Sequence, residues 1–241
     1  MTSSNPAAGP HAAGAHHHRD VSGGWLRAAV FGAMDGLVTT IALVAGVGGG
    51  GASREIIILT GVAGVVAGAF SMALGEFASV GAQNDAVAAE VALEREEIRR
   101  HPDAEQAELV DVYRRMGLTA ETAQAVAREV HADADLALRV HITQELGVDP
   151  DEQPSPSTAA VSSFLCFVMG GTLPLVPYLL GFDSLVAGLA VGAAGLVGAG
   201  ALTSRFTTRT WWASALRQLG FGVIAAAATY LVGWLIGITA F

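Results

Sequence analysis

Five long apolar segments constrain the fold of this 241-residue chain more than any other feature. A helix that crosses the hydrocarbon core of a bilayer needs about 20 mostly apolar residues. Tight hairpins join the first segment to the second and the third to the fourth. The segments cover residues 28–47, 56–80, 159–180, 184–202 and 219–241. The sequence therefore predicts an all-α integral membrane protein with five transmembrane helices.

The charged residues gather in the one long stretch between the second and third segments. Residues 81–155 hold 17 of the 22 acidic residues and 7 of the 13 arginines, whereas the rest of the chain has 5 acids and 6 arginines. Because the chain has no lysine and acids outnumber arginines, a basic nucleic-acid binder is excluded. The single cysteine, Cys166, excludes an internal disulfide framework and a thiolate zinc site. We interpret the chain as a nearly uncharged membrane body with one acidic insert.

This pattern divides the chain into four parts. They are a disordered tail at 1–24, the first two transmembrane helices at 25–80, the acidic helical insert at 81–157, and the last three transmembrane helices at 158–241. We assign no role to the histidines at 16–18 of the tail. Pro102, Gly117 and Gly147 mark helix ends in the insert. The helix of the second span is expected to continue through residues 82–100, and the other insert helices are expected at 103–116, 120–130 and 134–146.

Arginine placement orients the membrane body, because cytosolic loops carry an excess of basic residues. The two tight hairpins contain only Arg54. The arginines that mark the cytosolic side are Arg19, Arg27, Arg205, Arg209 and Arg217. With five spans, the N-terminus, the insert and the loop at 205–217 are expected in the cytosol, and the C-terminus outside.

Pairs of glycines four residues apart occur in three of the apolar segments. Such spacing lets helix backbones approach closely, within one subunit or between two. The pairs are 32/36, 64/68 and 188/192. Because glycine is common in membrane helices in general, the spacing alone does not identify a dimer face.

Two acids and a methionine in the first two segments could carry an ion. Asp35 lies about seven residues into the first span, roughly 10 Å below the cytosolic surface, where an ionisable group is costly and faces a protein interior or a water-filled path. Glu76 is near the cytosolic end of the second span, and Met72 shares its helix face. Because the helices run in opposite directions, these three residues are expected at a similar depth. They could pass a divalent cation or a proton; the alternative is a structural acid bonded to a neighbouring helix.

The insert carries ligand-type pairs three or four residues apart, which places both members on one helix face. The pairs are Glu94 with Glu97, Glu105 with Glu108, and His141 with Glu145. Carboxylates with one or two imidazoles suit Fe²⁺ or Mn²⁺ better than Cu⁺, and paired acids from several helices build di-iron bundles. On spacing alone, a solvated acidic face is the simpler interpretation of any one pair. His101 and His131 are interpreted as surface residues.

Two longer motifs resemble those of the vacuolar iron transporter family, including its bacterial members. Residues 31–39, FGAMDGLVT, followed by ALVAG at 42–46, are similar to the signature of its first helix. Residues 72–80, MALGEFASV, are similar to the signature of its second helix, with Phe77 where tyrosine is frequent. The acidic pairs of the insert and the ELG sequence at 145–147 match its cytosolic metal-binding domain. The resemblance extends from about residue 25 to the C-terminus.

The resemblance implies a homodimer with an ion path along its two-fold axis, between the first and second helices. In this path it places Asp35, Met72 and Glu76. It implies that metal is held at the cytosolic entrance by Glu94, Glu97, Glu105, Glu108 and Glu145. His141 stands where eukaryotic members tend to have methionine, and Gln144 where a second glutamate is common. Because imidazole is a good ligand for Fe²⁺, Mn²⁺ or Zn²⁺, we add His141 to the expected ligands without inferring an identical metal preference.

We therefore expect a transporter, not an enzyme, that moves Fe²⁺ and also Mn²⁺ out of the cytosol in exchange for protons across a bacterial plasma membrane. Its partners would be divalent cations, protons, the lipid bilayer and a second copy of the chain. No permanently bound cofactor is expected, and Zn²⁺ could also occupy the cytosolic site. One alternative is a membrane-anchored di-metal ferroxidase, whose usual Glu-x-x-His motifs do not occur in the insert. The other is a metal-sensing membrane protein without flux, which leaves Asp35 unexplained.

Overall fold

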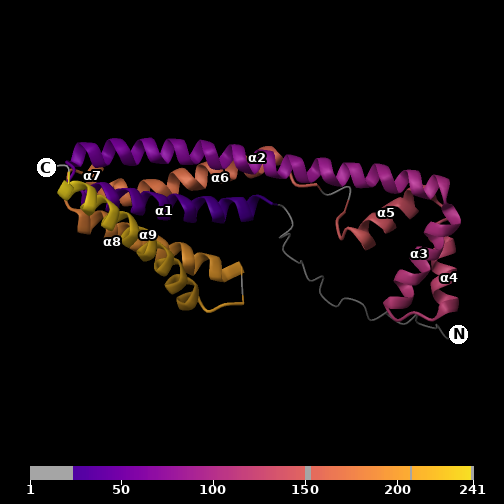
Figure 1. Ribbon diagram of the computed structural model, residues 1–241. Coiled ribbons are helices and arrows are strands. Elements are labelled where there is room, and N and C mark those ends of the chain that lie inside the picture. Colours follow the sequence, from indigo (N-terminus) through magenta and orange to yellow (C-terminus); the bar gives the residue numbers. More distant parts are fainter. Residues whose placement is uncertain (1–23, 150–152, 207, 240–241) are drawn as a thin grey trace, which may run out of the picture.

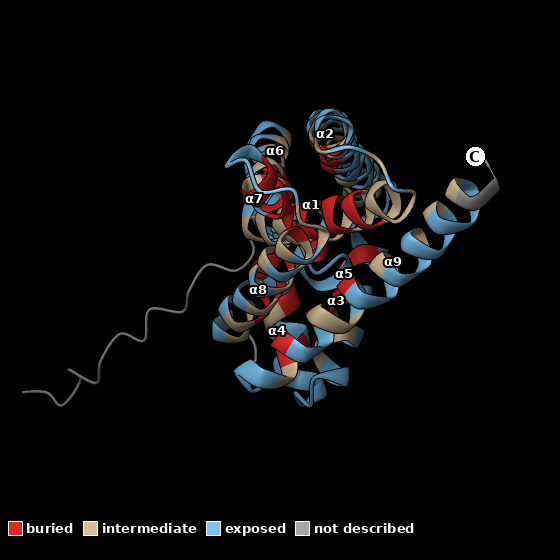
Figure 2. Cartoon of the chain, turned by 90° about the vertical axis from the view of Figure 1, so that its left-hand side faces the viewer, coloured by how far each residue is buried: buried red, intermediate tan, exposed pale blue. Residues whose placement is uncertain are grey.

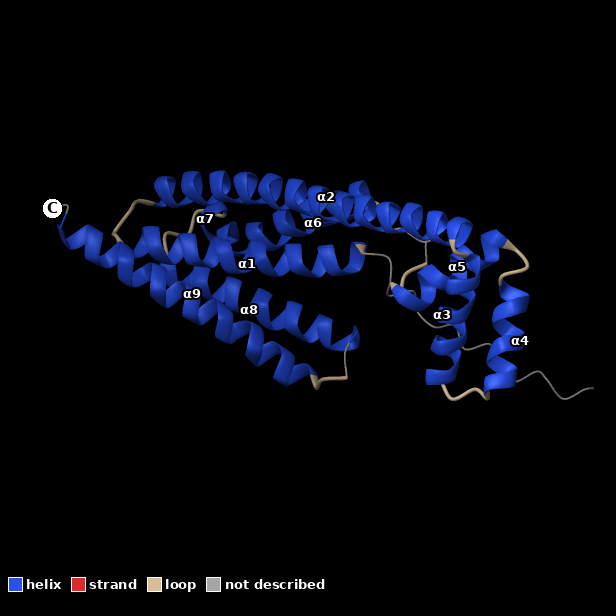
Figure 3. Cartoon of the chain, turned by 45° about the vertical axis from the view of Figure 1, so that its right-hand side comes forward, coloured by secondary structure: helices blue, strands red, loops and turns tan. Residues whose placement is uncertain are grey.

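The computed structural model describes residues 24–149, 153–206 and 208–239. Within these ranges the regular structure is entirely helical (Figure 3). A bundle of long helices forms one end of the elongated molecule, and the short helices of the insert lie at the other end (Figure 1). The tail expected at 1–24, with its histidines at 16–18, lies outside the described residues except for Gly24.

Five helices are long and apolar enough to cross a membrane, as the apolar segments predict. They are α1 (Trp25–Gly49), α2 (Arg54–Arg100), α6 with its continuation (Pro156–Leu179), α8 (Leu185–Thr203) and α9 (Trp211–Thr239). Buried residues concentrate where α1 meets its neighbours, whereas α9 is largely exposed (Figure 2). The exposed side chains of these helices include Leu74, Val186 and Ile224, as expected for faces that contact lipid. The chain is a multi-pass membrane protein.

The third span is interrupted near its end. After α6 (Pro156–Thr172) come a short 3-10 turn, η1 (Leu173–Leu175), and α7 (Val176–Leu179). Pro174 and Pro177 have no backbone N–H to donate, so the regular hydrogen bonding of an α-helix breaks there. Arg54 Nε donates a hydrogen bond of 2.8 Å to the carbonyl of Tyr178, which satisfies one of the acceptors left at the helix end.

Glycines set the distance between α1 and α6. A side-chain carbon at Gly36 would overlap the backbone of Phe167, and one at Gly170 would overlap the backbone of Ala33. The other members of the predicted glycine pairs also face atoms of the same chain: 32, 64, 68, 188 and 192. All three pairs therefore mediate packing within one subunit.

The last helix begins earlier than predicted. The sequence predicts a start at residue 219 with Arg217 in the preceding loop, but α9 begins at Trp211. Ser214 and Ala215 are buried in this extension, and a side-chain carbon at Gly200 of α8 would meet the backbone of Ala215. Packing against α8 thus adds about two turns to the apolar part of the helix.

As the sequence predicts, α2 continues without a break from the membrane body into the insert (Figure 1). Its 47 residues span about 70 Å at 1.5 Å per residue, so the boundary predicted between residues 80 and 81 falls inside one helix. The other insert helices are α3 (Pro102–Arg115), α4 (Ala120–Val130) and α5 (Ala134–Glu145). Thr119 caps α4 as predicted, its hydroxyl accepting from the N–H of Thr122 at 3.3 Å.

A small apolar core holds the insert together. It contains Leu109 of α3, Ala127 and Val130 of α4, and Ala137 of α5. Ile98 of α2 packs against it, so the core also attaches the three short helices to the end of α2. This core therefore fixes the positions of α3, α4 and α5 relative to one another and to α2.

Candidate metal centre

Three helices bring four ligand-type side chains together in the insert. His141 of α5 is 1% exposed, and its Nδ1 lies 3.2 Å from Oε1 of Glu94 on α2 and 3.2 Å from Oε1 of Glu145 on α5. Oε2 of Glu105 on α3 lies 3.8 Å from the same nitrogen. Ligand atoms of Glu94, Glu105 and His141 all lie within 4.8 Å of one another. We call these four residues the carboxylate–histidine cluster.

The local sequence explains how the cluster forms. α2 ends at Arg100 and Pro102 begins α3, because proline suits the first turn of a helix and not its interior. The chain reverses there, which brings Glu94 and Glu105 close to the same nitrogen. His141 and Glu145 are four residues apart and share a face of α5, and α5 lies against α2.

The cluster concentrates negative charge at a site that is largely shielded from solvent. The pKa of Glu94 is raised to about 7, first by burial, then by the charges of Glu145 and Glu105, a hydrogen bond with Glu105, and the charge of Glu108. Nδ1 of His141 makes its hydrogen bond with Glu145, and buried Oε1 of Glu94 has no hydrogen-bond partner among the described residues. A divalent cation placed here would satisfy that oxygen and offset the repulsion. Carboxylate and imidazole ligands suit Fe²⁺, Mn²⁺ and Zn²⁺.

Two of the predicted metal ligands lie at the edge of this cluster or beyond it. Glu108, one turn from Glu105, is exposed, although its charge reaches Glu94. The side chain of Glu97 is 43% exposed, and its Oε2 lies 4.0 Å from Nε2 of His101. Among the residues that the structure describes, the cluster contacts do not include Glu97. His101 itself is 62% exposed, which agrees with its interpretation as a surface residue.

The interpretation of His131 as a surface residue is wrong. Its ring is half-buried, with Nε2 3.0 Å from Nε2 of His141, and the two rings meet edge to face with centroids 5.2 Å apart. Burial and then the charge of His141 lower the pKa of His131. The sequence carries one signal, because His131 follows Ala123 and Ala127 at four-residue spacing and so shares their helix face. In the structure both alanines are fully buried.

In the membrane body, Asp35 lies on α1 with its side chain exposed on the surface of the single chain. The hydroxyl of Thr39, one turn later, donates a hydrogen bond of 3.4 Å to Oδ1 of Asp35. This partner belongs to the same helix. Within the described part of the chain, Asp35 therefore does not show the bond to a neighbouring helix that a structural acid would make.

The contact between α1 and α2 sets the relative depth of the membrane residues. A side chain at Gly64 of α2 would overlap Leu43 of α1, so these two positions lie opposite each other. The helices are antiparallel. Eight residues back from Leu43 along α1 is Asp35, and eight residues forward from Gly64 along α2 is Met72, so these two residues lie at the same depth. Glu76 is then about 6 Å nearer the insert. The depths of Asp35 and Met72 match, and Glu76 lies one turn away.

Glu76 is buried and pairs with Arg27 at the start of α1. Nη2 of Arg27 donates to Oε2 of Glu76 at 2.9 Å, with the arginine side chain 66% exposed and that of Glu76 9% exposed. Glu76 thus makes a bond to a neighbouring helix, as a structural acid would. This was the alternative to a role in ion passage. From the sequence, Arg27 was evidence only for the orientation of the membrane body. Its pairing with Glu76 could not be predicted from the sequence.

We expect Arg27→Met to lower the thermal stability of the protein, because it leaves the buried Glu76 carboxylate without its cation. The coupling between the two residues should be on the order of 1 kcal/mol, since the arginine is largely exposed. Thermal unfolding of Arg27→Met, Glu76→Gln and the double variant measures it. Additive effects of the two single substitutions would show that the pair contributes nothing.

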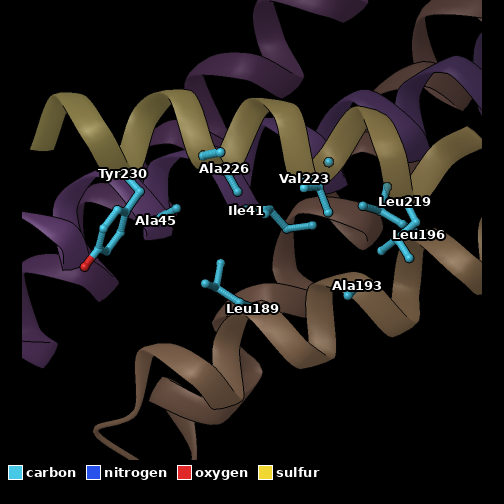
Figure 4. Close-up of a pocket in the computed structure, with 11 residues that line it drawn as sticks. Ile41, Ala45, Leu189, Ala193, Leu196, Leu219, Val223, Ala226 and Tyr230 are labelled. Carbon is cyan, nitrogen blue, oxygen red and sulfur yellow. The ribbon is translucent and has the colours of Figure 1, made fainter.

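A cavity of about 340 Å³ lies between α1, α8 and α9. Figure 4 shows that apolar side chains, among them Ile41, Leu189 and Val223, surround it. Its lining residues include no acid, histidine or cysteine. It is therefore separate in chemistry from both acidic sites.

The chain is thus an integral membrane protein with five helices long and apolar enough to span the bilayer and a carboxylate–histidine cluster in a helical insert. The sequence profile of the VIT family matches residues 26–234. The chain belongs to the VIT family, which confirms the resemblance found in its first two helices.

Named relatives match most of the chain. It is 33% identical over 211 residues to vacuolar iron transporter 1 of Eucalyptus grandis, covering 85% of this chain and 84% of the relative. It is 32% identical over 223 residues to vacuolar iron transporter 1 of Arabidopsis thaliana, covering 89% and 88%. A vacuolar iron transporter of Acanthamoeba castellanii is 33% identical over 217 residues, covering 88% and 78%. The relatives are named as transporters and not as enzymes.

Proposed function

We propose that this protein exports Fe²⁺, and also Mn²⁺, from the cytosol in exchange for protons. Family membership and the names of the relatives support metal-ion transport. The carboxylate–histidine cluster would collect the cation, and Met72, Glu76 and Asp35 would pass it through the membrane.

The observation that carries the proposal is the arrangement of residues along α2. Glu76 and Glu94 lie on one uninterrupted helix, and their 18-residue separation is five full turns, so both project from the same face about 27 Å apart. Met72 lies one turn further on and about 40° around the axis. One side of α2 therefore carries Glu94 of the cluster as well as Glu76 and Met72 of the membrane body. A cation released from the cluster would meet Glu76 and then the level of Met72 and Asp35.

Proton exchange follows from the chemistry of the ligands. A cation and a proton compete for the same carboxylate lone pairs, so a carboxylate that releases metal on the far side can return with a proton. Asp35 is the residue to do this, because no ion pair holds it among the described residues. Glu76 would join only when the cation displaces Arg27 from its carboxylate.

We propose that the working unit is a homodimer. Asp35 is exposed on the surface of a membrane-spanning helix, and an ionisable group facing lipid is costly. A second copy of the chain, covering this face, would turn the lipid-exposed carboxylate into the wall of a shared path.

The arginine distribution supports an orientation with the insert in the cytosol, and we place the protein in the plasma membrane of a bacterium. The relatives described above are named for the vacuole. Removal of metal from the cytosol is the same direction across either membrane. The ions are substrates, with no permanently bound cofactor, and Zn²⁺ would also bind the cluster because its ligands suit a borderline cation.

The test is transport by the purified protein in proteoliposomes loaded with an iron-sensitive dye. When the lumen is acidic, we expect Fe²⁺ to enter the proteoliposomes faster than it enters dye-loaded liposomes without protein. The lumen should become more alkaline as the metal enters. Oxygen consumption after Fe²⁺ addition should stay at background, since the proposed activity involves no oxidation. Oxygen uptake without metal entry would contradict transport and favour the alternative, a ferroxidase.

Metal affinity at the cluster is expected to rise with pH between about 6 and 8. Glu94 has a pKa of about 7, so below this pH the metal must displace its proton, whereas above it the carboxylate is already charged. For one displaced proton, each pH unit below the pKa lowers affinity by up to about tenfold. Titrations with Zn²⁺ at pH 6, 7 and 8 measure the slope. Glu94→Gln should bind more weakly and with a shallower slope; an equal slope would show that Glu94 is not the group that titrates.

A further inference from the structure

His141 presents its two nitrogen atoms to two different groups. Nδ1 lies 3.2 Å from Glu94 and Glu145 and 3.8 Å from Glu105. Nε2, on the other side of the ring, lies 3.0 Å from Nε2 of His131. The His141 side chain is 1% exposed, so neither nitrogen has ready access to bulk water as a substitute partner.

A metal ion at the cluster would decide where this ring carries its proton. A neutral imidazole has one N–H group and one lone pair. When Nδ1 gives its lone pair to a cation, the proton must sit on Nε2, where it needs an acceptor. Histidine ligands commonly donate their other N–H group in this way, which fixes the ring orientation. Here the atom within reach is Nε2 of His131.

His131 is held in position by the end of α4. It is the residue that caps this helix, and its backbone N–H donates to the carbonyl of Ala127 at 2.9 Å. Ala127 and Val130 belong to the apolar core of the insert. The packed structure therefore already holds His131 within hydrogen-bond distance of Nε2 of His141 before any metal arrives.

We propose that His131 is a positioning residue of the metal site. Its Nε2 accepts a hydrogen bond from the Nε2–H of His141 and thereby holds His141 in the tautomer whose Nδ1 binds the cation. The inference rests on the proposed function, because it requires that the cluster bind metal. It also gives α4 a role in metal binding, although α4 contributes no residue to the cluster.

The first test is Zn²⁺ titration of the full-length protein in detergent micelles. His131→Leu should weaken binding by about 10- to 100-fold, the range expected when the partner of a histidine ligand is lost. His131→Gln should stay within about threefold of the wild type, because its side-chain carbonyl can accept the same hydrogen bond. His101→Leu, at an exposed histidine of the same insert, is the control and should bind normally. Unchanged affinity in His131→Leu, or equal losses in the Leu and Gln variants, would overturn the inference.

The second test needs no substitution at His131. Nitrogen NMR of the ¹⁵N-histidine-labelled protein reports which ring nitrogen carries a proton, and His141→Gln identifies the signals of His141. With Zn²⁺ bound, we expect metal-shifted Nδ1 and protonated Nε2 in His141, with no metal shift in His131. A metal shift at Nε2 of His131 would make it a direct ligand and overturn the positioning role. If the wild type binds no Zn²⁺ at the cluster, both the inference and the proposed metal site fail, whereas normal binding in His131→Leu removes the inference alone.

Discussion

Asp35→Asn is expected to slow Fe²⁺ entry into proteoliposomes by about 100-fold or more. At an effective dielectric constant of about 20, a carboxylate about 4 Å from a cation stabilises it by about 4 kcal/mol per unit of cation charge. Losing about 3 kcal/mol of this stabilisation at the barrier is enough for a 100-fold effect. Asparagine keeps the size of the side chain and removes its charge and its ability to exchange a proton. The same variant should also lose the coupled change in luminal pH.

Asp183→Asn is the matched control, because it makes the same substitution in the short connection between α7 and α8. Asp183 is exposed there, outside the spanning helices. This variant should transport at the wild-type rate, and both variants should elute as folded protein after extraction. Wild-type transport by Asp35→Asn would mean that the ion does not pass this residue.

Gly36→Leu is expected to prevent recovery of folded protein from the membrane. A side-chain carbon at this position would overlap the backbone oxygen of Phe167 and lie 2.9 Å from the backbone nitrogen of Gly171. Neither atom can move as a flexible side chain would, so α1 and α6 would have to separate. The overlap begins with the first carbon of leucine, and the cost should exceed the roughly 1–3 kcal/mol typical of overpacking.

Gly198→Leu provides the comparison on another spanning helix. Gly198 of α8 is exposed, and a side-chain carbon there would meet nothing within 4 Å. Leucine also favours helix more than glycine does, by somewhat under 1 kcal/mol. Gel filtration and thermal unfolding after extraction should show Gly198→Leu as stable as the wild type. Folded Gly36→Leu of equal stability would contradict the close approach of α1 and α6.

Much of the fold could be predicted because its strongest signals are local. An apolar segment of about 20 residues crosses a bilayer as a helix whatever lies beside it, so the five spans were identified. The helix ends in the insert carry their own signals, such as Pro102 at the start of α3 and Thr119 at the start of α4. The start of α9 could not be predicted in this way, because the contact of Ala215 with α8 extends the helix there and such a contact has no clear signal in the local sequence.

The site divides in the same way. His141 and Glu145 lie on one helix, so their spacing alone predicted that they share a face. The other contacts of the site form between different helices and depend on their packing. Arg27 pairs with Glu76, and His131 contacts His141. Packing also brings Glu94 to the cluster, while Glu97, three residues later, makes its described contact with His101.

Segment length, apolarity and charge belong to each stretch of chain separately, so the amino-acid sequence is enough to predict a helical membrane protein with one acidic insert. It also indicated Asp35 as a residue to explain, because a charge within a span is costly in any arrangement. Which ligand-type side chains meet at one point, and which atoms can accept their protons, depends on how the helices pack. Hydrogen bonds and ion pairs act over about 3–4 Å, and only the packing of helices far apart in sequence brings those atoms within this distance.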